Sequence, residues 1–340
     1  MSKFSFKIAS ILLLTGLIAC QPTSNFSDSN NNEPSKVTLR TAHSNWIEEH
    51  FQTEIVKIGL EKLGYQVETP REIDYPAIYV SLANEDLDYS IIYYDPLHQS
   101  FFDNAGGSEK LEGVGNVTPN KIAGYQIDKK TADKYKISNI EQLKDPKIAK
   151  LFDSDGDGKA NLVGCNAGWA CELVIDHHIE AYKLNDTVEH DRGQYTALLA
   201  DSITRHKQGE SVLFVAFNPH WIGVVLKPDR DVVWLEVPFT SLPEKMGDNI
   251  AVKDTSANGK NLGFAKYQQR VVANKKFLEA NPKAKRWFEL IEIPTEDINK
   301  ESLRIKEGEN KPEDIRRHAE EWVTNNQELF DSWIAEATQE

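Results

Sequence analysis

The chain has 340 residues, with 39 basic and 53 acidic side chains, a formal net charge of −14 and three cysteines. It lacks the clustered positive charge that nucleic-acid binding requires, so nucleic acid is excluded as a partner. The length is sufficient for two domains. After the first twenty residues no apolar stretch approaches membrane-spanning length, so the body is expected to be globular and soluble.

The first twenty residues have the pattern of an export signal. Lys3 and Lys7 give a positive start, and the apolar run over 8–18 is short for a bilayer span. The run ends in LIAC, a lipobox, which predicts that Cys20 is diacylated and becomes the new N-terminus. A plain secretory signal with an incidental cysteine is the alternative. Residues 21–36 are polar and rich in Asn and Ser, which predicts a flexible tether.

The two other cysteines, Cys165 and Cys171, lie six residues apart around a Gly-containing turn. In an exported protein this pair predicts a disulfide. Metal binding is the alternative, but two thiols without a second Cys or His pair make a poor zinc site. The predicted disulfide also disfavours cysteine nucleophilic catalysis, because it leaves no thiolate.

Strand and helix patterns alternate from residue 37 onward. Strands are predicted over 37–42, 65–67 and 89–94, with helices over 47–63 and 77–83 between them. The first helix is expected to end at Gly64, which suits a left-handed C-cap. This β-α-β-α-β order predicts a parallel, doubly wound sheet whose ligand binds at the C-terminal ends of strands.

A second α/β set and a helical C-terminus follow. Strands are predicted over 122–127, 212–217, 232–237 and 271–273, and helices over 148–152, 172–182, 195–208, 275–280, 283–291 and 313–335. Two domains are therefore expected, 37–125 with 271–340, and 126–270. The crossovers fall near Tyr125 and Val271. The apolar stripe of the last helix, with Trp322 and Trp333, is expected in the core.

Enzyme signatures are absent from the sequence. It contains no Gly-x-Ser-x-Gly, Walker A, Gly-x-Gly-x-x-Gly or His-Glu-x-x-His motif. His177 and His178 are neighbours on a predicted helix, so their side chains diverge by about 100° and are expected to be partly exposed. The chain is not expected to be an enzyme, and an exported hydrolase is the alternative in that class.

Three aromatic residues lie at or just beyond strand ends. Tyr94 ends the strand that precedes Pro96-Leu97-His98, Trp169 lies between the two cysteines, and Phe217 ends the strand before Asn218-Pro219. Each of them alone would be typical of an aromatic residue packed in the core. Three together, at strand ends of two α/β halves, indicate a binding site.

The cysteine loop adds a second element to this site. A helix is expected to begin at its end, so the N–H groups near Ala170 and Cys171 would be unpaired first-turn donors that bind a carboxylate. Aromatic faces opposite them would hold a cation that has no N–H, by dispersion and cation–π attraction. The combination suggests a small zwitterion with one carboxylate and one methylated cationic end.

Six stretches of the chain resemble the periplasmic glycine betaine/proline-binding proteins of osmoprotectant ABC importers: 60–65 (LEKLGY), 96–98 (PLH), 124–132 (GYQIDKKTA), 140–153 (IEQLKDPKIAKLFD), 164–172 (GCNAGWACE) and 232–235 (VVWL). The resemblance extends from about Val37 to the C-terminus. It implies a bilobal α/β fold of the type II periplasmic-binding-protein class, with two doubly wound domains around a cleft.

The resemblance also implies the ligand contacts. The aromatic box for a trimethylammonium group falls on Tyr94, Trp169 and Phe217. The carboxylate contacts fall on the backbone of Ala170 and Cys171, with His98 beside them. Family members usually have tryptophan at all three box positions, whereas here only Trp169 is one. Glycine betaine is the expected ligand, with proline betaine or proline beside it. Choline, carnitine and dimethylsulfoniopropionate are the alternatives.

The implied partners are an ABC permease and its cytoplasmic ATPase. The protein is expected as a monomeric lipoprotein on the periplasmic or extracytoplasmic face of the membrane. A solute-sensing lipoprotein that signals without transport is the alternative, because the sequence does not separate the two.

Residues 153–158 form an acidic segment with the spacing of a cation-binding loop. Asp153, Asp155, Asp157 and Gly158 match the start of a calcium loop. The twelfth position, where the bidentate glutamate belongs, is Gly164. An acidic turn is the favoured interpretation and a structural Ca²⁺ the alternative. No other cofactor is expected.

Overall fold

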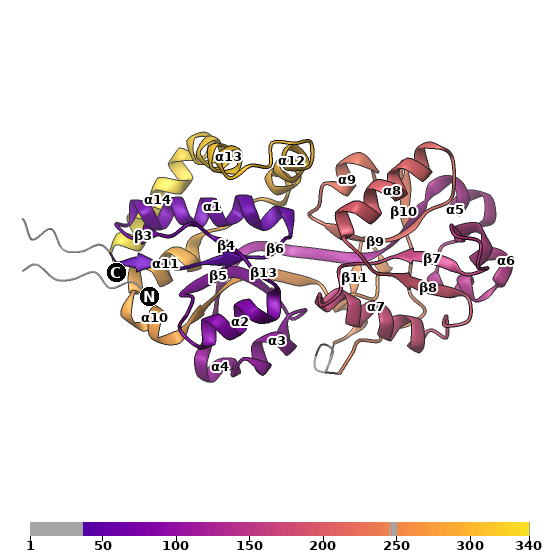
Figure 1. Ribbon diagram of the computed structural model, residues 1–340, viewed down its shortest axis with the longest axis horizontal. Coiled ribbons are helices and arrows are strands. Elements are labelled where there is room, and N and C mark those ends of the chain that lie inside the picture. The colour runs from indigo at the N-terminus through magenta and orange to yellow at the C-terminus, as the bar shows by residue number, and fades with distance from the viewer. Residues whose placement is uncertain (1–36, 245, 247–249, 340) are drawn as a thin grey trace, which may run out of the picture. The chain divides into compact units, whose positions relative to one another are not determined.

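The computed structural model describes residues 37–244, 246 and 250–339. The predictions for Cys20 and for the tether over 21–36 lie outside these residues. The described residues form one compact unit. Within it, two α/β lobes lie at the two ends of a pair of connecting strands (Figure 1).

The first lobe opens with the predicted β-α-β-α-β order. Its parts are β1 (Thr38–Leu39), β2 (Ala42–His43), α1 (Ile47–Lys62), β3 (Gln66–Val67), β4 (Arg71–Glu72), α2 (Tyr75–Ala83) and β5 (Tyr89–Asp95). β1 pairs in parallel with β3, and β2 with β4. Gly64 follows the first helix with a φ of +96°, as predicted for a left-handed cap. The N–H of Tyr65 then donates to the carbonyl of Leu60 at 3.0 Å.

Two antiparallel strands, β6 (Leu111–Asp128) and β13 (Tyr267–Asn274), connect the lobes. β13 lies between β5 and the first part of β6 in the first lobe. The second part of β6 pairs with β9 (Leu213–Asn218) in the second lobe. The predicted domain boundaries, at 125/126 and 270/271, fall on these two strands and stay predictions.

The second lobe continues the sheet in the order β6-β9-β7-β8, with β10 on the other side of β6. β7 is parallel to both β8 and β9, whereas β6 is antiparallel to β9 and β10, so the sheet of this lobe is mixed. Its strands are β7 (Ala160–Val163), β8 (Val188–Asp191), β9, β10 (Val232–Trp234), β11 (Ser256–Ala257) and β12 (Lys260–Asn261). Its helices are α5 (Lys129–Tyr135), α6 (Pro146–Ala149), α7 (Ala170–Ala181), α8 (Tyr195–Lys207) and α9 (Ile222–Val225). Short 3₁₀ turns cover Ile140–Lys144, Lys150–Phe152 and Val252–Asp254.

The first lobe is completed by seven further helices. They are α3 (Gln99–Asn104), α4 (Gly107–Lys110), α10 (Lys275–Ala280), α11 (Pro282–Leu290), α12 (Thr295–Lys306), α13 (Pro312–Asn325) and α14 (Gln327–Thr338). The prediction of one helix over 313–335 is wrong. The helix breaks at Asn326, whose backbone is not helical (φ −115°, ψ 26°) and whose side-chain amide donates to the carbonyl of Trp322 at 2.9 Å. The core position predicted for Trp322 is confirmed, since it is buried.

The apolar residues form two clusters. One joins α1 to the C-terminal helices around Trp287, Phe288 and Phe330. The other contains Trp46 and Tyr79 of the first lobe and Phe214 of the second lobe. The second cluster therefore runs through the contact between the lobes.

Gly59 on α1 generates a stability prediction. A Cβ at this position would lie 2.2 Å from Cζ2 of Trp287, whose indole N–H donates to the carbonyl of Val56 at 3.1 Å. We expect Gly59→Ala to destabilise the protein by about 1–3 kcal/mol through overpacking, although alanine is the better helix former. Urea unfolding measures the change. Gly223→Ala in α9, where no atom lies within 4 Å of the added Cβ, is the control. Equal stability of the two variants would contradict the packing argument.

Candidate ligand-binding site

A pocket with an empty volume of about 360 Å³ lies where the lobes meet. All six residues predicted to contact the ligand line it, together with five that the sequence did not point to: Trp46, Tyr75, Leu97, Lys121 and Tyr267. The first lobe and the second lobe both contribute, and Lys121 and Tyr267 come from the connecting strands. The structure thus brings the predicted residues together, while their role as ligand contacts stays a prediction.

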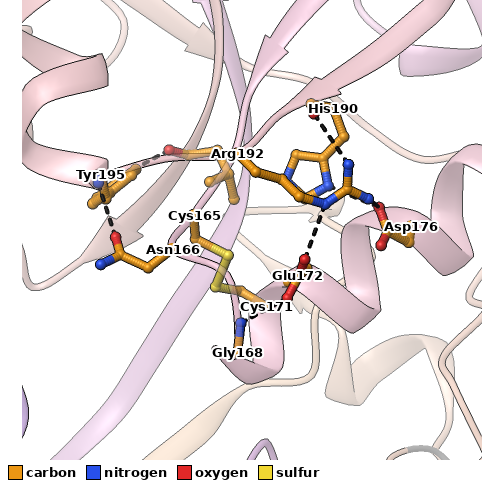
Figure 2. The surroundings of a disulfide bond; sticks show 10 residues. Cys165, Asn166, Gly168, Cys171, Glu172, Asp176, His190, Arg192 and Tyr195 are labelled. Atoms are coloured by element: carbon orange, nitrogen blue, oxygen red, sulfur yellow. Dashed lines mark hydrogen bonds and ion pairs between the residues drawn. A yellow bond between two sulfur atoms is a disulfide. The ribbon is translucent and has the colours of Figure 1, made fainter. Parts of the chain in front are cut away.

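The disulfide predicted between Cys165 and Cys171 is present, with an S–S distance of 2.10 Å. Figure 2 shows the bond at the start of α7, beside the carboxylate of Glu172. This carboxylate accepts the N–H of Gly168 at 2.7 Å and Nε of Arg192 at 2.9 Å. The loop is thereby tied to the helix that follows it.

Asn166 ties the same loop to α8. Its Oδ1 accepts the N–H of Tyr195 at 2.9 Å, the first residue of that helix (Figure 2). Gly168 has a φ of +83°, a conformation that favours glycine. With both ends held, Trp169 is placed directly before α7, half-buried and beside the pocket.

The N-terminus of α7 forms one edge of the pocket. The helix begins at Ala170, two residues earlier than predicted. The N–H groups of Ala170 and Cys171 have no acceptor within the helix, and we find none elsewhere in the described chain. Both residues are buried and line the pocket. Two free N–H donors at the positive end of a helix dipole are suited to a carboxylate.

Tyr94 is held by the buried carboxylate of Glu49. One oxygen of Glu49 accepts the hydroxyl of Tyr94 at 2.7 Å and that of Tyr75 at 2.8 Å, and the other accepts the N–H of Ser44 at 2.7 Å. Burial raises the pKa of both tyrosines well above its usual value, so both hydroxyls remain donors. Tyr94 therefore offers its ring, and not its hydroxyl, to the pocket.

His98 is buried beside Tyr94. Its ring centroid lies 5.0 Å from that of Tyr94 and 4.5 Å from that of Tyr75, and Nδ1 lies 3.3 Å from the hydroxyl of Tyr79. Burial lowers the pKa of His98 to about 3. The imidazole is thus neutral near pH 7 and can donate one hydrogen bond without adding a charge.

Lys121 is a buried cation in the pocket wall. Its side chain is 1% exposed, and Nζ lies 5.0 Å from the centroid of the Tyr94 ring. Burial lowers the pKa of Lys121, while Glu48 and Glu49 oppose that shift. Among the described residues no hydrogen bond or ion pair within 4 Å holds its ammonium. No pattern in the sequence singled out this lysine, which lies one residue before the strand predicted over 122–127.

Glu48 lies behind this lysine, with both carboxylate oxygens buried and unpaired within the described residues. Burial raises the pKa of Glu48, and the charge of Lys121 opposes the shift. The nearest charged candidate, Nε2 of His220, lies 3.8 Å from Oε1, but burial lowers the pKa of His220 to about 3. The Glu48 carboxyl is therefore expected to be protonated at neutral pH.

The histidine pair of α7 differs from expectation in part. His178 is fully buried, which corrects the prediction of partial exposure, whereas His177 is half-buried. Nδ1 of His178 lies 2.8 Å from the hydroxyl of Tyr125, and Nε2 lies 2.8 Å from the carbonyl of Ser241. Packing of α7 on the sheet, which spacing along one helix does not reveal, decides this burial.

The acidic loop brings Asp153, Asp155 and Asp157 close enough to share one ion. Each carboxylate also accepts N–H groups of the loop itself, Asp153 those of Gly156 and Gly158 at 2.6 and 3.0 Å. These bonds account for an acidic turn. The calcium alternative stays a prediction.

Two α/β lobes around a pocket with aromatic walls and a free helix N-terminus define a substrate-binding protein of the type II periplasmic class. The chain belongs to the family described as the substrate binding domain of ABC-type glycine betaine transport systems, whose model matches residues 37–325. It is therefore a binding subunit of an importer and not an enzyme, and it works outside the cytoplasm.

Similar proteins agree with this assignment. The glycine betaine-binding periplasmic protein OusX of Dickeya dadantii is 48% identical over 299 residues, which cover 88% of this chain and 89% of the relative. The glycine betaine/proline betaine-binding periplasmic protein of Escherichia coli is 46% identical over 302 residues, covering 88% and 90%.

Solved structures share the fold. ProX from Borrelia burgdorferi matches with a TM-score of 0.69 at 18% identity, covering 89% of this chain and 98% of that one. Lactococcal OpuAC in complex with glycine betaine matches with a TM-score of 0.66 at 16% identity, covering 88% and 100%. The fold prediction is confirmed. Among the helices of the described residues, none has the length and apolar character to cross a membrane.

Glu48 generates a prediction about pH. Its pKa is raised from 4.5 to about 8 by burial, so the folded state holds this proton more tightly than the unfolded state does. The contribution to stability is complete below about pH 4.5 and is lost as pH rises through 8. We expect Glu48→Gln, which needs no proton, to remove this loss. The difference in Tm between the variant and the wild type should grow by a few degrees from pH 5 to pH 8.

Thermal unfolding at the two pH values measures the effect. Glu141→Gln, at an exposed carboxylate on the second lobe, is the control and should leave the difference unchanged. A Tm difference for Glu48→Gln that is the same at both pH values would show that the wild-type carboxyl is ionised throughout.

Proposed function

We propose that this protein binds glycine betaine outside the cytoplasm and delivers it to an ABC permease. The observation that carries the proposal is the sequence of groups at the start of α7. The ring of Trp169 and the free N–H groups of the next two residues line one pocket. One end of the ligand then meets aromatic surface while the other meets helix-terminal donors.

The cationic end is assigned to the aromatic side of the pocket. A quaternary ammonium has no N–H to donate, so dispersion and cation–π attraction are what bind it. Tyr94, Trp169 and Phe217 supply aromatic rings there. Tyrosine and phenylalanine have weaker π faces than tryptophan, and choline-, carnitine- and sulfonium-type solutes share the same cationic chemistry.

The carboxylate end is assigned to Ala170, Cys171 and His98. The first two supply free N–H donors, and a neutral His98 adds one hydrogen bond. Both relatives described above are named for betaines that carry a carboxylate. A ligand without a carboxylate would leave these buried donors without a partner, which costs binding free energy.

The lobes are expected to adopt an open arrangement and a closed one, and the ligand shifts the balance because it binds the closed arrangement more tightly. A ligand that contacts both lobes favours the arrangement in which they touch. That arrangement, in a monomer tethered through lipidated Cys20, would dock on the permease while the ATPase works on the cytoplasmic side. No bond is made or broken by the binding protein itself.

Calorimetric titration tests the ligand assignment. We expect a chain beginning at Ser35 to bind glycine betaine, and Trp169→Ala to weaken binding by about tenfold or more, because a desolvated aromatic face contributes about 2 kcal/mol to binding a cation. Trp333→Ala, on α14 in the first lobe, is the control and should bind as the wild type does. Choline, which lacks the carboxylate, should bind more weakly than glycine betaine. Tighter binding of choline would reassign the ligand.

The lipid anchor has its own test. We expect the full chain, expressed with a radiolabelled fatty acid, to carry the label and to sediment with membranes. Cys20→Ser should abolish both, since the thiol is the acylation site. A variant that remains labelled, or a wild type found entirely in the soluble fraction, would contradict the lipoprotein assignment.

A further inference from the structure

Trp46, directly before α1, lies against two of the aromatic residues assigned to the ligand's cation. Its ring centroid is 5.2 Å from that of Trp169, at an interplanar angle of 70°, and 5.2 Å from that of Phe217, at 82°. The side chain is buried and lines the same pocket. Three rings that meet edge to face form adjoining walls of one aromatic corner.

Trp46 is the first-lobe ring that contacts both second-lobe rings, whereas Tyr75 lies near Trp169 alone, at 6.1 Å between ring centroids. Trp169 and Phe217 belong to the second lobe, where Tyr195 and His220 back the indole of Trp46 at 5.9 and 4.9 Å. These contacts fix the orientation of the indole. A rigid aromatic face binds a cation at little further entropic cost.

The ring of Tyr94 is less suited than that of Trp46 to bind a ligand cation, because a cation of the protein already lies over it. Its nearest aromatic neighbours are His98, Tyr267 and Tyr75, and within the described residues its ring makes no recorded contact with Trp169 or Phe217. The ammonium of Lys121 already lies over the Tyr94 ring at 5.0 Å. A ligand cation at the same face would be repelled by that charge, and the repulsion is strong in a buried site.

We propose that Trp46 is a specificity-determining wall of the ligand site, which encloses the quaternary ammonium group together with Trp169 and Phe217. The proposal rests on the function proposed above and names the first-lobe residue that completes the cation site. In this arrangement Trp46 takes the place that was assigned to Tyr94 above, and Tyr94 lies with Lys121 toward the carboxylate end. A cationic ligand held between Trp46 and the two second-lobe rings favours contact between the lobes.

Fluorinated tryptophans at position 46 test the proposal. Successive fluorine atoms withdraw electron density from the indole ring. They weaken the attraction of the ring face for a cation and change the size of the ring little. In the mature chain, we expect the Kd for glycine betaine to rise stepwise with fluorine number, by about tenfold in all. The Kd for 3,3-dimethylbutanoate, the uncharged isostere with a carbon in place of the ammonium nitrogen, should stay constant.

Two controls accompany the series. The same residues placed at Trp287, in the core of the first lobe, should change neither Kd. Trp46→Phe, which keeps an aromatic face, should stay closer to the wild-type Kd than Trp46→Ala, for which a loss of about tenfold or more is expected.

The possible results distinguish a failure of the role of Trp46 from a failure of the proposed function. A glycine betaine Kd that is insensitive to fluorination, or an equal change for the isostere, would overturn the role of Trp46. Tighter binding by Trp46→Ala would also overturn it, because the indole would then occupy the site instead of walling it. If the unmodified chain binds no betaine, the proposed function itself fails, and this inference fails with it.

Discussion

The position of Trp169, one residue before α7, is the constraint on which the ligand site depends. Because the residue before a helix is extended while the next ones are helical, its side chain and their free N–H groups can face the same space. The disulfide and the bonds of Glu172 and Asn166 hold this segment on two helices. In the proposed ligand site, a single loop thereby supplies an aromatic surface for the cationic end of the ligand and free N–H donors for its carboxylate.

The charged groups under the pocket follow a second constraint, which is that burying a charge is costly unless it is satisfied. Glu49 meets this constraint with three donors, two of them tyrosine hydroxyls. Glu48 has no such donors among the described residues, and burial raises its pKa, so we expect it to be neutralised by a proton. Lys121 therefore remains the cation that faces the pocket without a partner among the described residues.

The sequence was sufficient where the signal is local. Apolar periodicity and Gly64 defined the first helix, and the spacing of Cys165 and Cys171 defined the disulfide. β6 was predicted only from residue 122, although it begins at Leu111. The segment between contains Gly113, Gly115 and Pro119, which disfavour strands, and pairing with the distant β13 is what makes it one.

The same distinction applies to the ligand site. Tyr94, Trp169 and Phe217 could be found because each lies at a strand end or in a loop with a recognisable pattern. Trp46 and Lys121 could not, since one precedes an ordinary amphipathic helix and the other lies within a strand. Their place in the pocket is decided by contacts with the other lobe or with the distant Tyr94. The apolar pattern likewise did not reveal the non-helical backbone of Asn326, which divides the last helix into two.

The two connecting strands have a mechanical consequence. Sliding one lobe past the other would break the ladder between β6 and β13, whereas bending across it would not. The register of β13 shifts on both sides of Gln269, and such bulges make a strand easier to bend and twist. Bending then separates Trp46 from Trp169 and Phe217 before any strand pairing is lost. If Trp46 encloses the solute as proposed, the time a solute spends bound would depend on how often these aromatic contacts part, and not on the strength of the sheet.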